Sequence, residues 1–227
     1  MHAVVMAAGE GRRMRPITER YAKPVLPIDG RPAIVTLLHE LAGAGITRVS
    51  VVIGHLGEQV EGLLEGFPLE VRFVQQPRPD GSADAVRRSL EALPAVVAAS
   101  DTVFAAGDVA RVAGTPGHAL AVRRDPPPDP KHRRPMRISD GRVVRVVDDD
   151  PGNPLGSAPL WRLGETFDRT ILDDLPGPPY ELSQAFQRLV DAGEILHAVE
   201  IGATRDLTHP QDLIRENFPY LRGMKEL

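Results

Sequence analysis

The sequence contains no cysteine. Disulfide bonds, thiolate chemistry and cysteine metal sites are therefore excluded. Long apolar runs are also missing: none approaches the ~20 residues of a membrane span, and residues 1–8 have neither the basic start nor the length of a signal peptide. We therefore predict a cytoplasmic protein with no membrane partner. Aromatic residues are few, with one Trp and three Tyr, so a cage of rings around a quaternary ammonium has few candidate members.

The chain also lacks a strong excess of charge of either sign, since its formal net charge is −4. Such a balance provides no global attraction to nucleic acid, although a local basic patch can still bind phosphate. We predict a small anionic ligand and no nucleic-acid partner. The 227 residues, of which 42% are hydrophobic and 26% charged, suit one globular domain that buries a substantial core.

Short apolar runs alternate with amphipathic segments over the first hundred residues or so. This alternation is typical of β-α-β units that build a parallel sheet covered on both faces, so we predict an α/β fold. Residues 125–135, DPPPDPKHRRP, are rich in proline and charge and should form an exposed, partly extended excursion. The expected strands are 2–8, 49–53, 69–74, 96–99, 143–147, 159–163 and 197–201, and the expected helices are 33–41, 58–64, 82–93, 182–192 and 210–221.

Residues 7–18, AAGEGRRMRPIT, directly follow the first expected strand. Gly9 and Gly11 let backbone N–H groups approach phosphate oxygens without obstruction from a Cβ atom, and the arginines alongside can add charge-assisted hydrogen bonds. The segment therefore predicts an anion site, with a tight turn and solvated arginines as the alternative. A dinucleotide-binding loop is disfavoured, because Met14 stands where that motif has its third glycine and Pro16 replaces the start of its helix.

A second motif, Lys23-Pro24-Val25-Leu26-Pro27, comes shortly afterwards. A lysine held between rigid proline turns can be aimed at the same phosphates. Together, G-x-G-x-R-M-x-P-x-T and K-P-x-x-P resemble the nucleotidylyltransferase family that activates sugar 1-phosphates. That family includes glucose-1-phosphate thymidylyltransferase and the short muramate-1-phosphate uridylyltransferases.

The resemblance implies a Rossmann-like, mostly parallel sheet with helices on both faces, plus a small β-rich sugar-binding part. We expect a single domain over residues 1–227, with a nucleotide-binding half over 1–122 and a sugar-phosphate-binding half over 123–227. The same resemblance implies that Ala8, Gly9 and Gly11 contact the nucleotide. It also implies that Arg13 and Lys23 are the catalytic residues that stabilise the phosphates during transfer.

Residues 76–85, QPRPDGSADA, resemble the Q-P-x-P-x-G segment of the thymidylyltransferases. This resemblance implies that Gln76 reads the edge of the base and that Gly81 and Ser82 lie against the nucleotide. A glutamine offers one donor and one acceptor, which matches the imide edge of uracil or thymine. We therefore expect UTP or dTTP as the donor, whereas the segment taken alone would be a turn before a helix.

Nucleotidyl transfer places a crowded polyanion in the site, and Mg²⁺ held by one or two carboxylates is the usual means of neutralising it. Asp101 is the preferred ligand, because Ser100-Asp101-Thr102-Val103-Phe104 resembles the family's G-D-x-x-F with serine for glycine. Asp108 is its rival. Asp206 is the second expected ligand, since Asp206 to Pro210 keeps the spacing of the family's D-x-G-T-P.

Two further segments concern the acceptor. Tyr180-Glu181-Leu182-Ser183 resembles the family's Y-E-L-T-D, which implies that Glu181 binds sugar hydroxyls; a favourable helix N-terminus is the alternative. Family members commonly carry an E-K-P segment whose lysine holds the sugar phosphate. The acids of residues 148–150 stand in its place here, and Lys131, Arg133 or Arg134 are the candidate replacements.

These residues predict an in-line attack of a sugar 1-phosphate oxygen on the α-phosphorus of UTP or dTTP, with Mg²⁺ as cofactor and a monomer or small homo-oligomer as the assembly. Three alternatives stay open. A non-catalytic nucleotide-binding regulator is compatible with Ser100 and the missing lysine. A phosphocholine cytidylyltransferase shares the glycine loop. A glycosyltransferase would need a D-x-D motif, and residues 148–150 contain one far from the nucleotide half.

Overall fold

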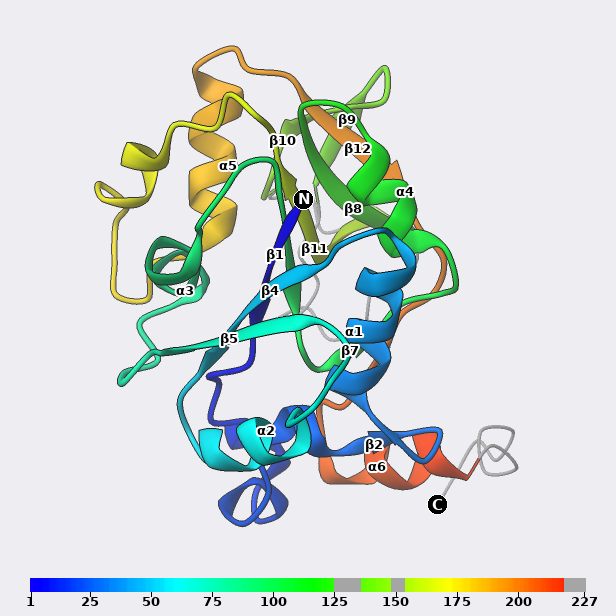
Figure 1. The fold of residues 1–227 in the computed structure, drawn as a ribbon. Coiled ribbons are helices and arrows are strands. Elements are labelled where there is room, and N and C mark those ends of the chain that lie inside the picture. The colour runs from blue at the N-terminus through cyan, green and yellow to red at the C-terminus, as the bar shows by residue number, and fades with distance from the viewer. Residues whose placement is uncertain (125–135, 148–153, 219–227) are drawn as a thin grey trace.

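Nine strands form one sheet in this computed structural model, which describes residues 1–124, 136–147 and 154–218. Their order is β5-β4-β1-β6-β11-β8-β12-β10-β9 (Figure 1). Only β11 and β10 run opposite to the other seven strands of this sheet. The strands are β1 His2–Met6, β4 Arg48–Ile53, β5 Glu70–Gln75, β6 Ala95–Ala99, β8 His118–Arg124, β9 Arg137–Ser139, β10 Arg142–Arg145, β11 Leu155–Leu163 and β12 Leu196–Glu200.

Helices cover both faces of this sheet (Figure 1). Alternate residues of β1 point to opposite faces, so Ala3 and Val5 join one core whereas Val4 joins the other. The first core is covered by α1, α2 and α4, and the second by α3 and α5. These helices are α1 Ala33–Gly43, α2 Gly57–Leu63, α3 Ser82–Ser89, α4 Asp108–Gly114 and α5 Leu182–Asp191, and α6 Pro210–Asn217 lies near the end of the described chain.

The first four strands of the large sheet in chain order are β1, β4, β5 and β6, and β1 lies between β4 and β6. After β1 the chain adds β4 and β5 on one side, then returns through α3 over the opposite face and adds β6 on the other side. All four strands are parallel, so their carboxyl ends lie at one edge. Open α/β sheets bind ligands at the carboxyl edge where the strand order reverses. In this sheet that point lies between β1 and β6.

Several short elements surround this edge. Three 3₁₀ turns, η1 Arg12–Met14, η2 Ile17–Glu19 and η3 Lys23–Val25, lead from β1 to the small hairpin of β2 Pro27–Ile28 and β3 Arg31–Pro32. Beyond β6, β7 Thr102–Val103 pairs with β13 Arg205–Asp206. A fourth turn, η4 Arg169–Leu172, precedes α5. The β7–β13 pairing therefore places residues 205–206 beside the loop that follows β6.

The α/β prediction is confirmed, including the mostly parallel sheet with helices on both faces. The expected helix over 82–93 ends earlier, at Ser89, because the chain must reach the start of β6 at Ala95 and Pro94 favours an extended residue before it. The sequence pattern predicts no element over 100–117 or 118–124, where the structure has α4 and β8. The expected excursion over 125–135 lies outside the described residues.

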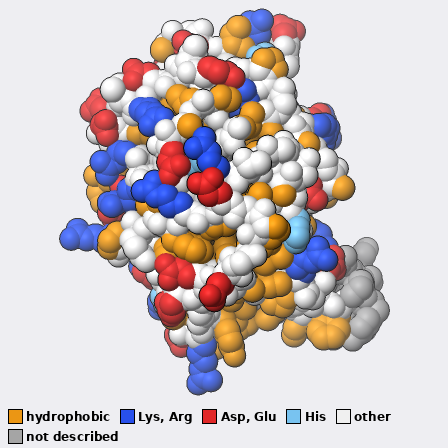
Figure 2. All heavy atoms as spheres, in the orientation of Figure 1, with side chains coloured by type: hydrophobic (Ala, Val, Ile, Leu, Met, Phe, Trp, Pro, Cys, Tyr) orange, Lys and Arg blue, Asp and Glu red, His pale blue; other side chains and the backbone are white. Residues whose placement is uncertain are grey.

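The surface carries charges of both signs. On the face shown in Figure 2, basic and acidic side chains are interspersed, which agrees with the small net charge. Among the described helices, none is both long and apolar enough to cross a lipid bilayer.

Two buried histidines connect the stability of the fold to pH. Burial is the largest influence on His2 and His118 and lowers the pKa of each below its usual value. His2 Nε2 pairs with Ser50 Oγ at 3.0 Å, and His118 Nδ1 accepts from the Gly164 N–H at 3.0 Å. The second ring nitrogen of each is buried without a hydrogen-bond partner among the described residues. Because His118 Nδ1 accepts from Gly164, the neutral ring carries its proton on Nε2, and a second proton would have to go to Nδ1 and abolish that hydrogen bond. Burial therefore favours the neutral form of both rings.

We predict that the free energy of unfolding falls as pH decreases below about 6.5, because the unfolded chain then takes up protons that the folded histidines resist. The slope contributed by each ring is at most about 1.4 kcal/mol per pH unit. Urea denaturation between pH 7.5 and 5 measures it. His118→Asn, whose Oδ1 can still accept from Gly164, should reduce the slope, and exposed His39→Asn should leave it. Equal slopes in all three proteins would contradict the prediction.

Candidate active site

Two adjoining cavities open at the carboxyl edge of the sheet, with volumes of ≈ 460 and ≈ 570 Å³. Both fall within the range of pockets that hold small-molecule ligands. We call them the first and the second cavity. They share a wall made of Met6, Arg13, Lys23, Ser82, Ala99, Asp101, Glu181 and Thr208. The wall lies where β1 and β6 end, which is the position that the strand order favours.

The eleven preferred site residues predicted from the sequence all line one or both of these cavities. Ten line the first cavity, and Asp206 lines the second. The structure therefore brings together segments from both ends of the chain, whereas the roles of the individual residues stay predictions. The ten are Ala8, Gly9, Gly11, Arg13, Lys23, Gln76, Gly81, Ser82, Asp101 and Glu181.

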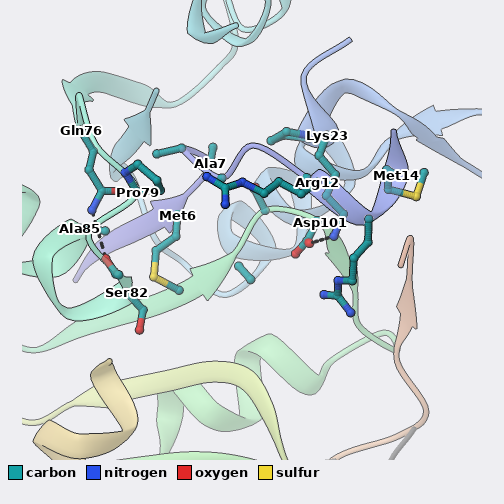
Figure 3. A pocket seen from close by; sticks show the side chains of 18 of the residues that line it. Met6, Ala7, Arg12, Met14, Lys23, Gln76, Pro79, Ser82, Ala85 and Asp101 are labelled. Carbon is teal, nitrogen blue, oxygen red and sulfur yellow. Dashed lines mark hydrogen bonds and ion pairs between the residues drawn. The ribbon is translucent and has the colours of Figure 1, made fainter. Parts of the chain in front are cut away.

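The loop after β1 is held in shape by its own motif residues. Arg12 and Met14 of this loop are labelled in Figure 3. Gly11 adopts a left-handed conformation with φ 61°, and a Cβ atom there would lie 2.9 Å from Thr18 Cγ2. Thr18 Oγ1 donates to the Gly11 carbonyl at 2.9 Å. Met14 is fully buried against Leu26 and its neighbours. These contacts fix the turn that carries Arg13, which lines both cavities.

An ion pair joins two of the predicted residues across the shared wall. Lys23 Nζ on η3 donates to Asp101 Oδ2 after β6, as the dashed line in Figure 3 shows. Burial raises the pKa of Asp101, but the charge and hydrogen bond of Lys23 outweigh burial and hold that pKa below its ordinary value. Asp101 is therefore a carboxylate at neutral pH, and its negative charge is matched by Lys23.

The second predicted carboxylate lies close by in the β7–β13 pair. Asp206 stands opposite Thr102, the residue after Asp101, and accepts from Thr102 Oγ1 at 2.6 Å. Both carboxylates line the second cavity. Asp108 differs: it is buried at the start of α4, pairs with Arg111 and accepts from the Gly202 N–H at 3.0 Å. Asp108 lines neither cavity.

Gln76 follows β5 and is only 6% exposed, and in Figure 3 it reaches toward the loop that carries Pro79 and Ser82. Its Nε2 donates to the Gly81 carbonyl at 3.1 Å and to Asp84 Oδ2 at 2.9 Å. Both N–H bonds of the amide are thus used inside the protein. The sequence interpretation assigned Gln76 a donor and an acceptor for the base, whereas the structure leaves it the acceptor Oε1 only.

The loop over residues 76–85 is fastened to the segment that begins α5. The Tyr180 N–H donates to the Asp80 carbonyl at 2.7 Å, and the Tyr180 carbonyl accepts from the Ala83 N–H at 2.8 Å. Ser82 Oγ donates to Glu181 Oε2 at 2.8 Å and accepts from the Leu182 N–H at 2.8 Å. Glu181 is the N-cap of α5 and forms a capping box with Gln184. Glu181 therefore stands at a helix N-terminus, which was the alternative to sugar binding, and it also lines both cavities.

The sequence reasoning missed Arg123 and Trp161, which line the second cavity from β8 and β11. Arg123 is 12% exposed in its side chain, donates to Thr204 Oγ1 and lies 3.3 Å from Asp206 Oδ2. A cation directly after the apolar run of 119–122 was the available signal. Lys131, Arg133 and Arg134, and the acids of 148–150, lie outside the described residues.

Comparisons with known proteins identify a family and several relatives that this chain resembles. Residues 2–113 match the family model described as "Nucleotidyl transferase". The chain is 33% identical to CMP-5'-(3-aminopropyl)phosphonate synthase of Streptomyces rubellomurinus over 89% of this chain and 33% of that protein. It is 26% identical to glucose-1-phosphate thymidylyltransferase of Streptomyces griseus over 96% of this chain and 65% of that protein. The chain thus spans less than two thirds of the length of either relative.

A solved structure shows the same fold over the whole chain. The inositol-1-phosphate CTP transferase from T. maritima superimposes with a TM-score of 0.77 and 18% identity, covering 100% of this chain and 98% of that one.

Gly81 provides a test of the contact between the two loops. Its φ is 109°, and a Cβ atom would lie 2.6 Å from the Tyr180 backbone nitrogen and also against its carbonyl oxygen. We predict that Gly81→Ala lowers the free energy of unfolding by at least about 2 kcal/mol and disrupts the first cavity. Thermal unfolding and nucleotide titration measure both effects.

The matched control is Gly62→Ala in α2, where a Cβ atom meets nothing within 4 Å. This change should raise the free energy of unfolding by about 0.5–1 kcal/mol. A Gly81→Ala protein as stable as the control would show that the two loops are not locked together.

Proposed function

We propose that this chain transfers a nucleotidyl group from a pyrimidine nucleoside triphosphate to a small acceptor that carries a phosphate or phosphonate. The proposal is supported by the match of residues 2–113 to the nucleotidyl transferase family, which the glycine loop and Lys23 also indicated. A sugar 1-phosphate is the acceptor predicted from the sequence, with UTP or dTTP as donor. The observation that carries the proposal is the wall of Arg13, Lys23 and Asp101 shared by two adjoining cavities. One cavity suits the triphosphate and the other suits the acceptor.

The shared wall is suited to an in-line displacement. An acceptor oxygen attacks the α-phosphorus, a new P–O bond forms, the bond between the α-phosphorus and the bridging oxygen breaks, and pyrophosphate leaves. Negative charge accumulates at the junction of the two ligands during this step. Arg13 and Lys23 lie at that junction and can stabilise the charge without a covalent intermediate.

Asp101 and Asp206 are the residues that would hold Mg²⁺. Their carboxylate oxygens are the donors that Mg²⁺ prefers, and one or two carboxylates completed by substrate phosphates are its usual set. The described residues contain no group of three or more His, Cys, Asp or Glu that could hold a metal ion by themselves, so the set depends on the triphosphate. When bound, the ion would supply further charge neutralisation.

The acceptor's anionic group has a candidate partner in Arg123. Its guanidinium lies in the second cavity beside Asp206, at the distance of an ion pair from one carboxylate oxygen. Guanidinium groups bind phosphate and phosphonate oxygens with two parallel hydrogen bonds. Arg123 would thus take the part of the lysine that the E-K-P segment supplies in other family members.

An amine-bearing phosphonate is a second candidate acceptor. Trp161, which is 5% exposed, and Glu181 both line the second cavity. An aromatic ring and a carboxylate are groups that bind an ammonium. The 33% identical relative is named as a synthase of a CMP-aminopropylphosphonate, and this supports an acceptor of that class.

The proposal is tested by pyrophosphate release from the purified protein with Mg²⁺. Each of CTP, UTP, dTTP, ATP and GTP is combined with sugar 1-phosphates, phosphocholine and aminoalkylphosphonates. Release with one pyrimidine triphosphate and one acceptor class is the expected result. Triphosphate binding by calorimetry without release for any combination would instead favour the non-catalytic regulator.

We predict that Lys23→Ala lowers kcat by about a hundredfold or more, because it removes a cation from the place where charge develops. Its effect on thermal unfolding should be small, since the Asp101 side chain is 28% exposed and water can reach its charge once Lys23 is removed. Arg20→Ala is the control: Arg20 is an exposed cation of the same loop and lines neither cavity. An unchanged kcat in Lys23→Ala would remove Lys23 from the mechanism.

We predict that Arg123→Ala raises the KM for the acceptor by about tenfold or more, the effect expected for a lost hydrogen bond to a charged group. The KM for the triphosphate should change far less. Arg124→Ala is the matched control, because Arg124 is the next residue of β8 and pairs with Glu200 on the surface. If both KM values rose together, or neither rose, Arg123 would not be the acceptor's partner.

A further inference from the structure

Gln76 is held in the first cavity by two acceptors at once. Its Nε2 donates to the Gly81 carbonyl and to the Asp84 carboxylate, at 3.1 and 2.9 Å. A carbonyl and a carboxylate can only accept hydrogen bonds. Turning the amide over would place Oε1 against both of them. The chemistry of the partners therefore determines which end of the Gln76 amide faces the protein and which end is left for a ligand.

Asp84 is itself fixed in place. Its side chain is 1% exposed and pairs with Arg87 at 2.7 Å and with Arg88 at 2.6 Å, in the first turns of α3. Burial raises the pKa of Asp84, but the hydrogen bonds from Arg88, Gln76 and Arg87 outweigh burial and leave that pKa below its usual value. Asp84 is therefore ionised and keeps its role as acceptor throughout the neutral range.

We propose that Asp84 locks Gln76 as an acceptor-only reader and that the first cavity thereby selects cytosine over uracil and thymine. The inference rests on the proposed function and names its donor as CTP, in place of the UTP or dTTP predicted from the sequence. Cytosine carries an amino group at position 4, which can donate to Gln76 Oε1.

Uracil and thymine carry a carbonyl oxygen at position 4. A glutamine that reads an imide edge donates its N–H to that oxygen while its own oxygen accepts from N3–H. The N–H bonds of Gln76 are committed to Gly81 and Asp84, so the carbonyl at position 4 would lose its donor and face a second oxygen. An unpaired buried acceptor weakens binding by about tenfold or more.

Calorimetric titration without an acceptor substrate tests the inference separately from turnover. CTP, UTP, dTTP, ATP and GTP are each titrated into the protein in the presence of Mg²⁺. We expect CTP to bind about tenfold or more tightly than UTP and dTTP. Equal affinities, or a preference for UTP, dTTP or a purine triphosphate, would overturn the choice of cytosine while leaving nucleotidyl transfer intact. Failure of every triphosphate to bind would overturn both.

Two variants identify the residues responsible. Gln76→Leu removes the acceptor, so it should weaken CTP binding and leave UTP binding nearly unchanged; a reader of the imide edge would show the opposite loss. In the Asp84→Asn variant, Arg87 and Arg88 would donate to the new amide oxygen, so the NH₂ group of the asparagine would face Gln76. The Gln76 amide could then rotate and present its own NH₂ group to the base. The ratio of CTP to UTP affinity should then fall at least about threefold, a change that general loosening of the fold would not produce.

Arg78→Ala is the matched control, because Arg78 is exposed in the same loop and lines neither cavity. It should keep the wild-type ratio. Thermal unfolding of each variant shows whether it is folded. If Asp84→Asn does not fold, the affinities of Gln76→Leu for CTP and UTP test the inference by themselves. A wild-type ratio in folded Gln76→Leu would show that Gln76 does not select the base.

Discussion

The site depends on one constraint of the sheet: β1 has a parallel neighbour on each side, β4 and β6, and both pairings are in register over the full length of β1. The backbone of β1 is therefore fully paired, and the loop that leaves it must emerge at the edge between two other strand ends. Ala7 still donates to Val52 of β4 at 2.8 Å, so the glycine loop begins only after the sheet has fixed its direction. Asp101 follows β6 at the same edge. The Lys23–Asp101 ion pair is thus a consequence of strand order, since it joins two loops that the sheet places side by side.

Steric limits then shape the two loops that border the first cavity. At Gly11 and Gly81 the backbone is left-handed and a Cβ atom would meet neighbouring atoms at less than 3 Å. At Gly9, in contrast, a Cβ atom would meet nothing within 4 Å. Gly11 and Gly81 are therefore explained by packing within the protein, and a purely structural turn would need Gly11 equally. What distinguishes the site from a turn is the convergence of Arg13, Lys23 and Asp101 on one shared wall.

Local patterns allowed the fold class and an anion-binding glycine loop to be predicted, because each depends on short segments of the chain. Ten residues of the first cavity were predicted because short motifs resemble those of a known family. The rest depends on pairings between distant segments. Asp206 was found only through a resemblance, since its position beside Thr102 arises from a two-residue strand pairing. Arg123 was missed because its strand has a brief apolar run between His118 and two arginines. The orientation of Gln76 could not be read from its residue type, because it is determined by hydrogen bonds to Gly81 and Asp84.

The two cavities also explain why the match to the family model carries more information about the proposed transfer than about the proposed acceptor. The family model matches residues 2–113, and these supply every residue of the first cavity except Glu181 and Thr208. The part of the second cavity that is not shared has one residue from that range, Thr102. Its other residues come from β8, β11 and the segment that begins at β13. A match over the first half therefore carries information on the nucleotide and on the transfer step. The proposed acceptor would contact a different set of side chains, which is consistent with resemblance both to a relative named for a sugar phosphate and to one named for an aminophosphonate.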